Sequence, residues 1–139
     1  MTSALEEKEA IREVLAEYCF RLDDGRYDEM AALFTEDGTW DTAFGTAKGR
    51  AEIAALARDI RARAGENRPR GIHLVTNIVI ALADGSGGNA AIVRSNWTVV
   101  QNSPTGPKIG SGGGYADQMA KEDGQWRFRY RKIDRFIAG

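Results

Sequence analysis

One histidine and two adjacent aspartates are the residues of this chain whose chemistry stands out. His73 is the only histidine, and it stands near the start of a largely apolar segment, Leu74 to Leu82. A neutral imidazole titrates at about pH 6.5, so a histidine in partly enclosed space can take a proton from a substrate carbon and pass it on. Asp23 or Asp24 could orient the ring by accepting a hydrogen bond from one of its nitrogens. Together they would form a proton-abstracting dyad.

Each of these residues also has an ordinary structural interpretation. A core histidine can simply hydrogen-bond a backbone carbonyl, and acidic residues beside a glycine, here Gly25, are common in turns. Tyr18 lies on the apolar face of an expected helix, so its hydroxyl either donates to a substrate oxygen or finds a partner in the core. Composition leaves both interpretations open.

Aromatic residues could line a binding cavity. Trp40, Trp97 and Trp126 supply large apolar area in segments expected to be strands. At least one of them could contact an aromatic or alicyclic ligand, although tryptophans in such segments are usually core residues.

Arginines alternate with aromatic residues near the end of the chain, from Trp126 to Arg131. A period of two is typical of a strand with one wet and one dry face. Strict alternation puts Arg131 on the wet face with Arg127 and Arg129, and a bulge would be needed to turn it inward. The glycine run at residues 110–114 lacks the lysine and the strand-loop-helix context of a phosphate-binding loop, so it favours a bent strand.

Helices are expected in the first half of the chain. Ser3 and Glu6 have capping-box spacing, and the apolar residues that follow recur at helical intervals until residues 23–25 end the first helix. A short second helix directs three apolar residues inward: Met30, Leu33 and Phe34. Residues 36–38 then form a turn into a short strand at 39–42.

A third helix precedes the strands. Its apolar residues are spaced three or four apart, and Gly65 and Pro69 end it. The apolar set is Ile53, Leu56, Ala57 and Ile60.

After Gly71 the sequence predicts four strands separated by turn residues. The turns, at residues 84–89, 103–107 and 122–124, have the composition of hairpins and not of parallel crossovers. The predicted strands are Ile72 to Leu82, Ala90 to Gln101, Ile109 to Ala120 and Gln125 to Ile137.

This order predicts a segregated α+β fold. Three amino-terminal helices pack on one face of a curved, mainly antiparallel sheet and enclose a pocket. With 139 residues, the chain is expected to form a single domain, 1–139.

Composition limits the partners. Lys and Arg number 19 against 20 for Asp and Glu, and this net charge of −1 disfavours nucleic acid and acidic membranes. No apolar run approaches the roughly 20 residues of a membrane span, and the acidic start is unlike a signal peptide. Cys19 cannot form an internal disulfide, which fits a cytoplasmic setting. One cysteine and one histidine give no recognisable metal site, although a carboxylate-only site stays open.

Several segments together resemble a known family. They run from Tyr18 to Asp28 and from Leu33 through Asp37 to Trp40, and continue with Lys48-Gly49-Arg50, Ile72 to Asn77 and Asp123 to Trp126. The chain thereby resembles the SnoaL-like proteins of the nuclear transport factor two-like superfamily. That superfamily includes scytalone dehydratase, hexachlorocyclohexane dehydrochlorinase, ketosteroid isomerase and polyketide cyclases, and it implies a cystatin-like cone.

The resemblance implies roles for individual residues. The dyad of the dehydratase and dehydrochlorinase branch falls on Asp23 and His73, and an oxyanion-stabilising tyrosine falls on Tyr18. The general-base position of ketosteroid isomerase is Thr42, with Asp41 beside it, which argues against that isomerase chemistry. The second histidine of scytalone dehydratase has no counterpart around residues 94–97, so its substrate is not assumed.

The resulting hypothesis is a cofactor-independent lyase that acts on a small, cyclic, fairly apolar substrate. His73 would remove the proton, Asp23 would orient His73, and Tyr18 would stabilise charge on a substrate oxygen. Expected substrate contacts are Trp40, Asn96, Trp97 and Arg131. A non-catalytic ligand-binding protein and a polyketide cyclase or isomerase are the alternatives, and the resemblance also implies a homodimer or homotrimer.

Overall fold

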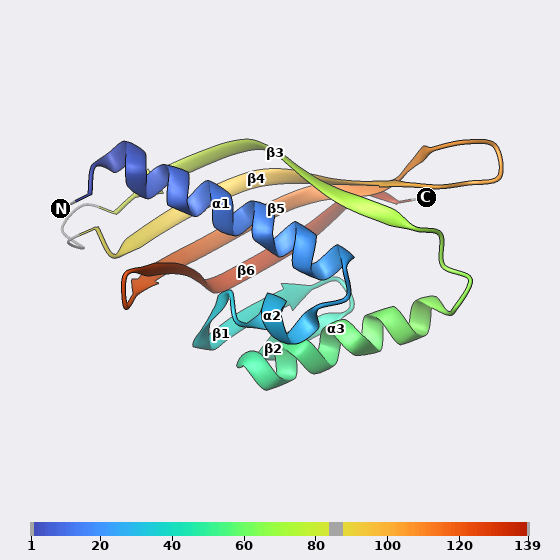
Figure 1. Ribbon diagram of the computed structural model, residues 1–139, viewed down its shortest axis with the longest axis horizontal. Helices are drawn as coiled ribbons and strands as arrows, with labels where there is room; N and C mark the ends of the chain where they lie inside the picture. The colour runs from blue at the N-terminus through green and yellow to red at the C-terminus, as the bar shows by residue number, and fades with distance from the viewer. Residues whose placement is uncertain (1, 84–87, 139) are drawn as a thin grey trace.

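In the computed structural model, which describes residues 2–83 and 88–138, three helices pack on a six-stranded sheet (Figure 1). The first helix, α1 (Ala4–Asp23), begins as the sequence predicts, because the Ser3 hydroxyl accepts a hydrogen bond from the backbone N–H of Glu6 at 3.1 Å. The chain leaves α1 through Gly25, whose φ of 73° lies in the left-handed region that glycine tolerates best. α1 thereby ends where the sequence places the candidate aspartates.

The segment after α1 differs in part from the prediction. The second helix, α2 (Tyr27–Ala31), is short and buries Met30 as expected. Phe34, however, already belongs to strand β1 (Phe34–Thr42), where it is fully buried. The predicted turn at residues 36–38 is an irregularity within β1, because pairing with the last strand shifts register between Phe34 and Thr39.

One short strand was not predicted from the sequence. β2 (Gly45–Lys48) forms an antiparallel hairpin with β1, and four residues are too few to show a clear alternation in the sequence. The third helix, α3 (Arg50–Ala64), follows and is capped by Gly65 as predicted. It buries Ile53, Ala54 and Ala57.

Four long strands complete the sheet, in the order β2-β1-β6-β5-β4-β3. They are β3 (Gly71–Leu82), β4 (Ala90–Gln101), β5 (Lys108–Glu122) and β6 (Gln125–Ala138). Only β1 and β6 pair in parallel, so the predicted mainly antiparallel α+β fold is confirmed. The turns predicted at 103–107 and 122–124 are present. The one predicted at Asp84 to Asn89 includes residues 84–87, which lie outside the described residues.

Register shifts and glycine bend the sheet. β5 and β6 change register between Gly112 and Gly113, and a Cβ atom on Gly113 would lie only 1.8 Å from the carbonyl oxygen of Asp134. Only glycine therefore fits at this close approach of two strands. A second shift, between β3 and β4, contains Asn77 with a φ of 55°. The predicted role of the glycine run in bending the strand is confirmed at Gly113.

A bulge in β6 turns Arg131 inward. Gln118 pairs with Tyr130 and Met119 pairs with Phe128, so Arg129 is an extra residue without a partner on β5. Alternation restarts after it, and Arg131 is consequently 0% exposed. The bulge that an inward Arg131 requires is therefore present.

Asp117 neutralises this buried guanidinium. Arg131 Nε donates to Asp117 Oδ1 at 2.8 Å, and Nη2 donates to Oδ2 at 3.2 Å. The guanidinium carbon lies 3.6 Å from the ring centroid of Tyr115, 4.2 Å from that of Tyr18 and 4.3 Å from that of Phe128. The ion pair and the cation–π contacts together offset the desolvation of Arg131.

Removal of one partner of this pair should be costly. Asp117→Asn leaves a buried charge without its counterion, so we expect it to lower the free energy of unfolding by about 3–5 kcal/mol. The double variant Asp117→Leu/Arg131→Met replaces the pair by apolar groups and should unfold at higher urea than Asp117→Asn. Urea unfolding followed by circular dichroism measures both, and an Asp117→Asn protein as stable as the wild type would contradict the expectation.

Candidate active site

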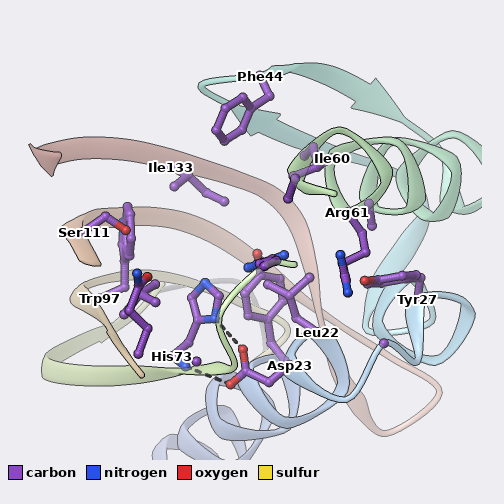
Figure 2. A pocket seen from close by; sticks show the side chains of 18 of the residues that line it. Leu22, Asp23, Tyr27, Phe44, Ile60, Arg61, His73, Trp97, Ser111 and Ile133 are labelled. Atoms are coloured by element: carbon purple, nitrogen blue, oxygen red, sulfur yellow. Dashed lines mark hydrogen bonds and ion pairs between the residues drawn. The ribbon is translucent and has the colours of Figure 1, made fainter. Parts of the chain in front are cut away.

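A cavity of about 680 Å³ opens between the carboxyl end of α1, the carboxyl half of α3 and the inner face of the sheet (Figure 2). Its volume is within the range of roughly 300–1,000 Å³ that small-molecule sites occupy. Much of its wall is apolar or aromatic. Leu22, Ile60, Trp97 and Ile133 are among the side chains that form this wall.

Asp23 and His73 face each other at one side of this cavity. Asp23 Oδ1 lies 2.5 Å from His73 Nδ1, and Asp23 Oδ2 accepts a hydrogen bond from the backbone N–H of His73 at 2.8 Å. Both side chains line the cavity and are mostly buried, with 11% of the Asp23 side chain and 16% of the His73 side chain exposed. The two residues that the sequence proposed as a dyad are thus in direct contact.

The two hydrogen bonds fix which ring nitrogen faces the ligand. An ionised carboxylate can only accept, so the proton between Asp23 and the ring belongs to Nδ1 when the imidazole is neutral. Nε2 then carries a free lone pair, and it has no hydrogen-bond partner in the described part of the chain. Figure 2 shows the His73 ring between Asp23 and the open cavity. The arrangement is that of an oriented general base.

Local structure explains why Asp23 is the partner of His73. Asp23 is the last residue of α1, and Asp24 follows it as the helix cap. The Asp24 side chain is 46% exposed, and Arg70, which belongs to the loop before β3, approaches it at 3.9 Å. The choice that the sequence left open is therefore settled in favour of Asp23.

Tyr18 supplies a hydroxyl to the same cavity. It lies one helical turn before Leu22 on α1, and its oxygen accepts a hydrogen bond from Trp40 Nε1 at 3.0 Å. Burial raises the pKa of Tyr18 well above its ordinary value, so the phenol stays protonated at neutral pH. Because Trp40 donates to it, the phenol's own proton is not used in this hydrogen bond. Both residues line the cavity, as predicted from the sequence.

The three tryptophans have different environments. Trp97 lines the cavity, with its ring centroid 6.2 Å from that of His73, and its Nε1 donates to the carbonyl oxygen of Asp134 at 3.1 Å. Trp126 is instead a core residue whose Nε1 donates to Glu7 Oε2 at 2.9 Å. Trp97 is therefore placed for ligand contact and Trp126 is not.

Two residues predicted to contact substrate are not among those that line the cavity. Asn96 lies between the inward-facing Ser95 and Trp97 of β4, and alternation turns it to the opposite face, where it bonds Asn77 and the carbonyl oxygen of Gly113. Arg131 is enclosed by its ion pair with Asp117 and by aromatic rings. The expected substrate contacts of Asn96 and Arg131 therefore need correction. Arg131 packs behind the cavity wall and positions Tyr18.

The isomerase-like position also lies away from the cavity. Asp41 accepts hydrogen bonds from the Tyr130 hydroxyl at 2.5 Å and from Thr46 Oγ1 at 3.0 Å. These bonds, led by that of Tyr130, hold the pKa of Asp41 below its ordinary value. Neither Asp41 nor Thr42 is among the lining residues. The geometry thus agrees with the sequence in arguing against a general base of the ketosteroid isomerase kind at this position.

Tyr115 is a cavity residue that the sequence analysis missed. It lies on β5 opposite Ile133 of β6, and the residue is only 3% exposed in the wall of the cavity. No hydrogen bond links its hydroxyl to another residue that the structure describes, and burial raises its pKa well above the ordinary value. Tyr115 shares one face of β5 with Gly113 and Asp117, because side chains alternate along a strand. The sequence does not show which face of β5 points inward, so this pattern alone could not identify Tyr115.

Within residues 2–83 and 88–138, no group of three or more His, Cys, Asp or Glu side chains could hold a metal ion. No helix of the described structure combines the length and the apolar character that a membrane span requires.

Comparison with known proteins identifies the family. A model of the SnoaL-like domain matches residues 3–132, which is nearly the whole chain. The chain belongs to the SnoaL-like family. None of the curated proteins compared matches this SnoaL-like chain significantly.

Solved structures share the fold. A protein of unknown function from Mycobacterium tuberculosis is 30% identical, with a TM-score of 0.79 over 96% of this chain and 76% of that one. A provisionally named scytalone dehydratase from Novosphingobium aromaticivorans is 28% identical, with a TM-score of 0.75 over 96% and 86% of the two chains. A protein from the same organism, described as NTF2-like with a cystatin-like fold, is 26% identical, with a TM-score of 0.78 over 93% and 81%. The resemblance and cystatin-like fold inferred from the sequence are thus confirmed.

The tautomer of His73 provides a test of the site geometry. We expect the neutral ring to carry its proton on Nδ1, and the ¹⁵N chemical shifts of the ring measure this directly. Asp23→Ala removes the acceptor, so the Nε2–H form that isolated histidine side chains favour should become populated. Asp24→Ala should leave the spectrum of the ring unchanged. A wild-type ring with its proton on Nε2 would contradict the assignment.

Proposed function

We propose that this SnoaL-like protein is a cofactor-independent lyase that eliminates a leaving group from a small, cyclic, fairly apolar substrate. The observation that carries the proposal is the contact between Asp23 and His73 at the wall of a ligand-sized cavity. The provisional name of the scytalone dehydratase relative supports the same reaction class.

The reaction begins with proton transfer to His73. Nε2 takes a proton from a substrate carbon next to an activating carbonyl group, and the C–H electrons move toward that carbonyl. Asp23 stabilises the imidazolium that forms, because its carboxylate already accepts from Nδ1–H. The base is therefore oriented before the substrate arrives.

Tyr18 stabilises the charge that develops on the carbonyl oxygen. Its protonated hydroxyl lies in a site shielded from water, where a preformed hydrogen bond is worth several kcal/mol. The electron pair then returns to form the carbon–carbon double bond as the adjacent carbon–oxygen bond breaks. His73 Nε2–H gives its proton to the departing hydroxide, so water leaves and the base is restored.

The walls of the cavity determine what kind of substrate fits. Trp97 and Tyr115 stack with their ring centroids 6.2 Å apart, and Trp97 lies beside the His73 ring. Flat or cyclic apolar groups pack well on such surfaces. The same base and the same hydroxyl could also serve a cyclisation or an isomerisation, which differ from elimination in the substrate and not in these two groups.

Substitution of the dyad tests the mechanism. In a screen of small cyclic hydroxyketones and halogenated compounds, we expect His73→Ala to lower kcat/KM for elimination by about 10²–10⁴, because the general base is lost. Asp23→Asn should also slow the reaction, whereas Asp24→Asn should stay near the wild-type rate. Equal rates in wild type and His73→Ala would remove the dyad mechanism. Ligand binding without turnover would favour the non-catalytic alternative.

We also propose that a second copy of this chain covers the open face of the sheet. Apolar side chains from all four long strands are exposed there, among them Ile92 at 64% and Phe136 at 71% exposed. Large apolar surfaces of this kind are typical of homodimers, whose sheets can pack face to face.

The cytoplasmic location remains part of the proposal and rests on the single Cys19.

Sedimentation tests the assembly. We expect a homodimer for the wild type and a shift toward monomer for Ile92→Lys, because a lysine buried in an apolar interface would lose its hydration. Leu5→Lys is a matched control, since Leu5 is exposed on α1 and away from this face. A wild-type protein that sediments as a monomer at all concentrations would refute the assembly.

A further inference from the structure

Arginines gather at the mouth of the cavity. Five of the residues that line it are arginines, and four of these are largely exposed, so they surround the opening and not the interior. They come from the end of α3, from the loop before β3 and from β6: Arg61, Arg63, Arg68, Arg70 and Arg135.

This charge is local and not a property of the whole chain. The protein has a net charge of −1, whereas Asp23 and Asp24 are the only carboxylates among the described residues that line the cavity. Asp23 is already bound to His73, and Asp24 lies 3.9 Å from Arg70. The mouth therefore has an excess of positive charge.

Two of these arginines are available for a ligand. Arg63 pairs with Asp59 at 2.6 Å, and Arg61 donates to the carbonyl oxygen of Gly65 at 2.7 Å. Arg68 and Arg135, by contrast, have no ion pair and no side-chain hydrogen bond to any residue in the described part of the chain. Both guanidinium groups are therefore free to bind a ligand at the rim of the cavity.

We propose that the ligand of this cavity carries an anionic group, a carboxylate or a phosphate, which Arg68 and Arg135 bind at the mouth while its cyclic apolar body lies beside Trp97 and His73. The inference rests on the proposed function only in taking this cavity as the substrate site. Guanidinium groups match both anions, because they offer paired N–H donors in one plane.

An anchor at the mouth would also serve the chemistry. A charged group held at the rim restricts how the apolar body can turn inside the cavity, so one carbon is presented to His73 Nε2. Anchoring also keeps the anion in partly hydrated surroundings, which avoids the cost of burying it. A neutral substrate would gain neither effect.

Paired fluorescent probes test the proposal without requiring turnover. The aromatic anion 8-anilinonaphthalene-1-sulfonate and the neutral N-phenyl-1-naphthylamine share an apolar body and differ in the sulfonate. We expect Arg68→Gln/Arg135→Gln to raise the dissociation constant of the anionic probe by about fivefold or more and to leave that of the neutral probe unchanged. Arg94→Gln is the matched control, because Arg94 is an exposed arginine on β4 that does not line the cavity.

Competition then identifies the anion. Displacement of the anionic probe by 1-naphthoate or by 1-naphthyl phosphate more strongly than by 1-naphthalenemethanol supports the proposal, and the better competitor distinguishes carboxylate from phosphate. Equal displacement by all three compounds would overturn it. So would a double variant, folded by circular dichroism, that binds both probes as the wild type does. Loss of elimination in His73→Ala with retained anion binding separates this inference from the catalytic one.

Discussion

The pair of hydrogen bonds that Asp23 accepts from His73 is the interaction on which the site depends. One carboxylate accepts both the backbone N–H and the ring Nδ1 of a residue 50 positions away. It thereby joins the end of α1 to the start of β3 and fixes the orientation of the imidazole in the same contact. One side chain therefore has both a structural and a chemical role. Oδ2 of Asp23 holds the backbone of β3, and Oδ1 orients the imidazole ring.

A second buried pair supports the cavity wall from behind. Arg131 and Asp117 lie behind the cavity, and the guanidinium packs on the rings of Tyr18 and Tyr115. Those two tyrosines are the buried hydroxyls of the cavity, so the charge that packs against them also positions them. The burial that raises their pKa values keeps them as hydrogen-bond donors. The core of this protein therefore contains a polar cluster beside the cavity.

The cavity divides into regions of different polarity. His73 and Tyr18 bring polar groups to the interior, Trp97 and Tyr115 supply apolar surface, and arginines surround the opening. An apolar ring with an anionic arm would meet each region with the matching part of its structure. Family membership gives the fold, whereas the contact between Asp23 and His73 and the polarity of the rim are features of this chain's own residues.

Much of the fold and part of the site could be predicted from the sequence. The capping box at Ser3, the helix end at Gly25 and the hairpin turns are local signals, because neighbouring residues decide them. The same local patterns, together with the family resemblance, brought Asp23, His73 and Tyr18 into one hypothesis. Strand β2 was missed because four residues carry too weak a pattern.

Only the tertiary structure could decide which face each strand residue occupies. A bulge at Arg129 reverses the alternation of β6 and buries Arg131, whereas regular alternation turns Asn96 away from the cavity. The choice between Asp23 and Asp24, the place of Tyr115 and the gathering of arginines at the mouth likewise depend on how distant segments pack. Local sequence specifies the helices and turns through short-range forces, but the contents of the cavity follow from register and long-range contacts, which no single segment encodes.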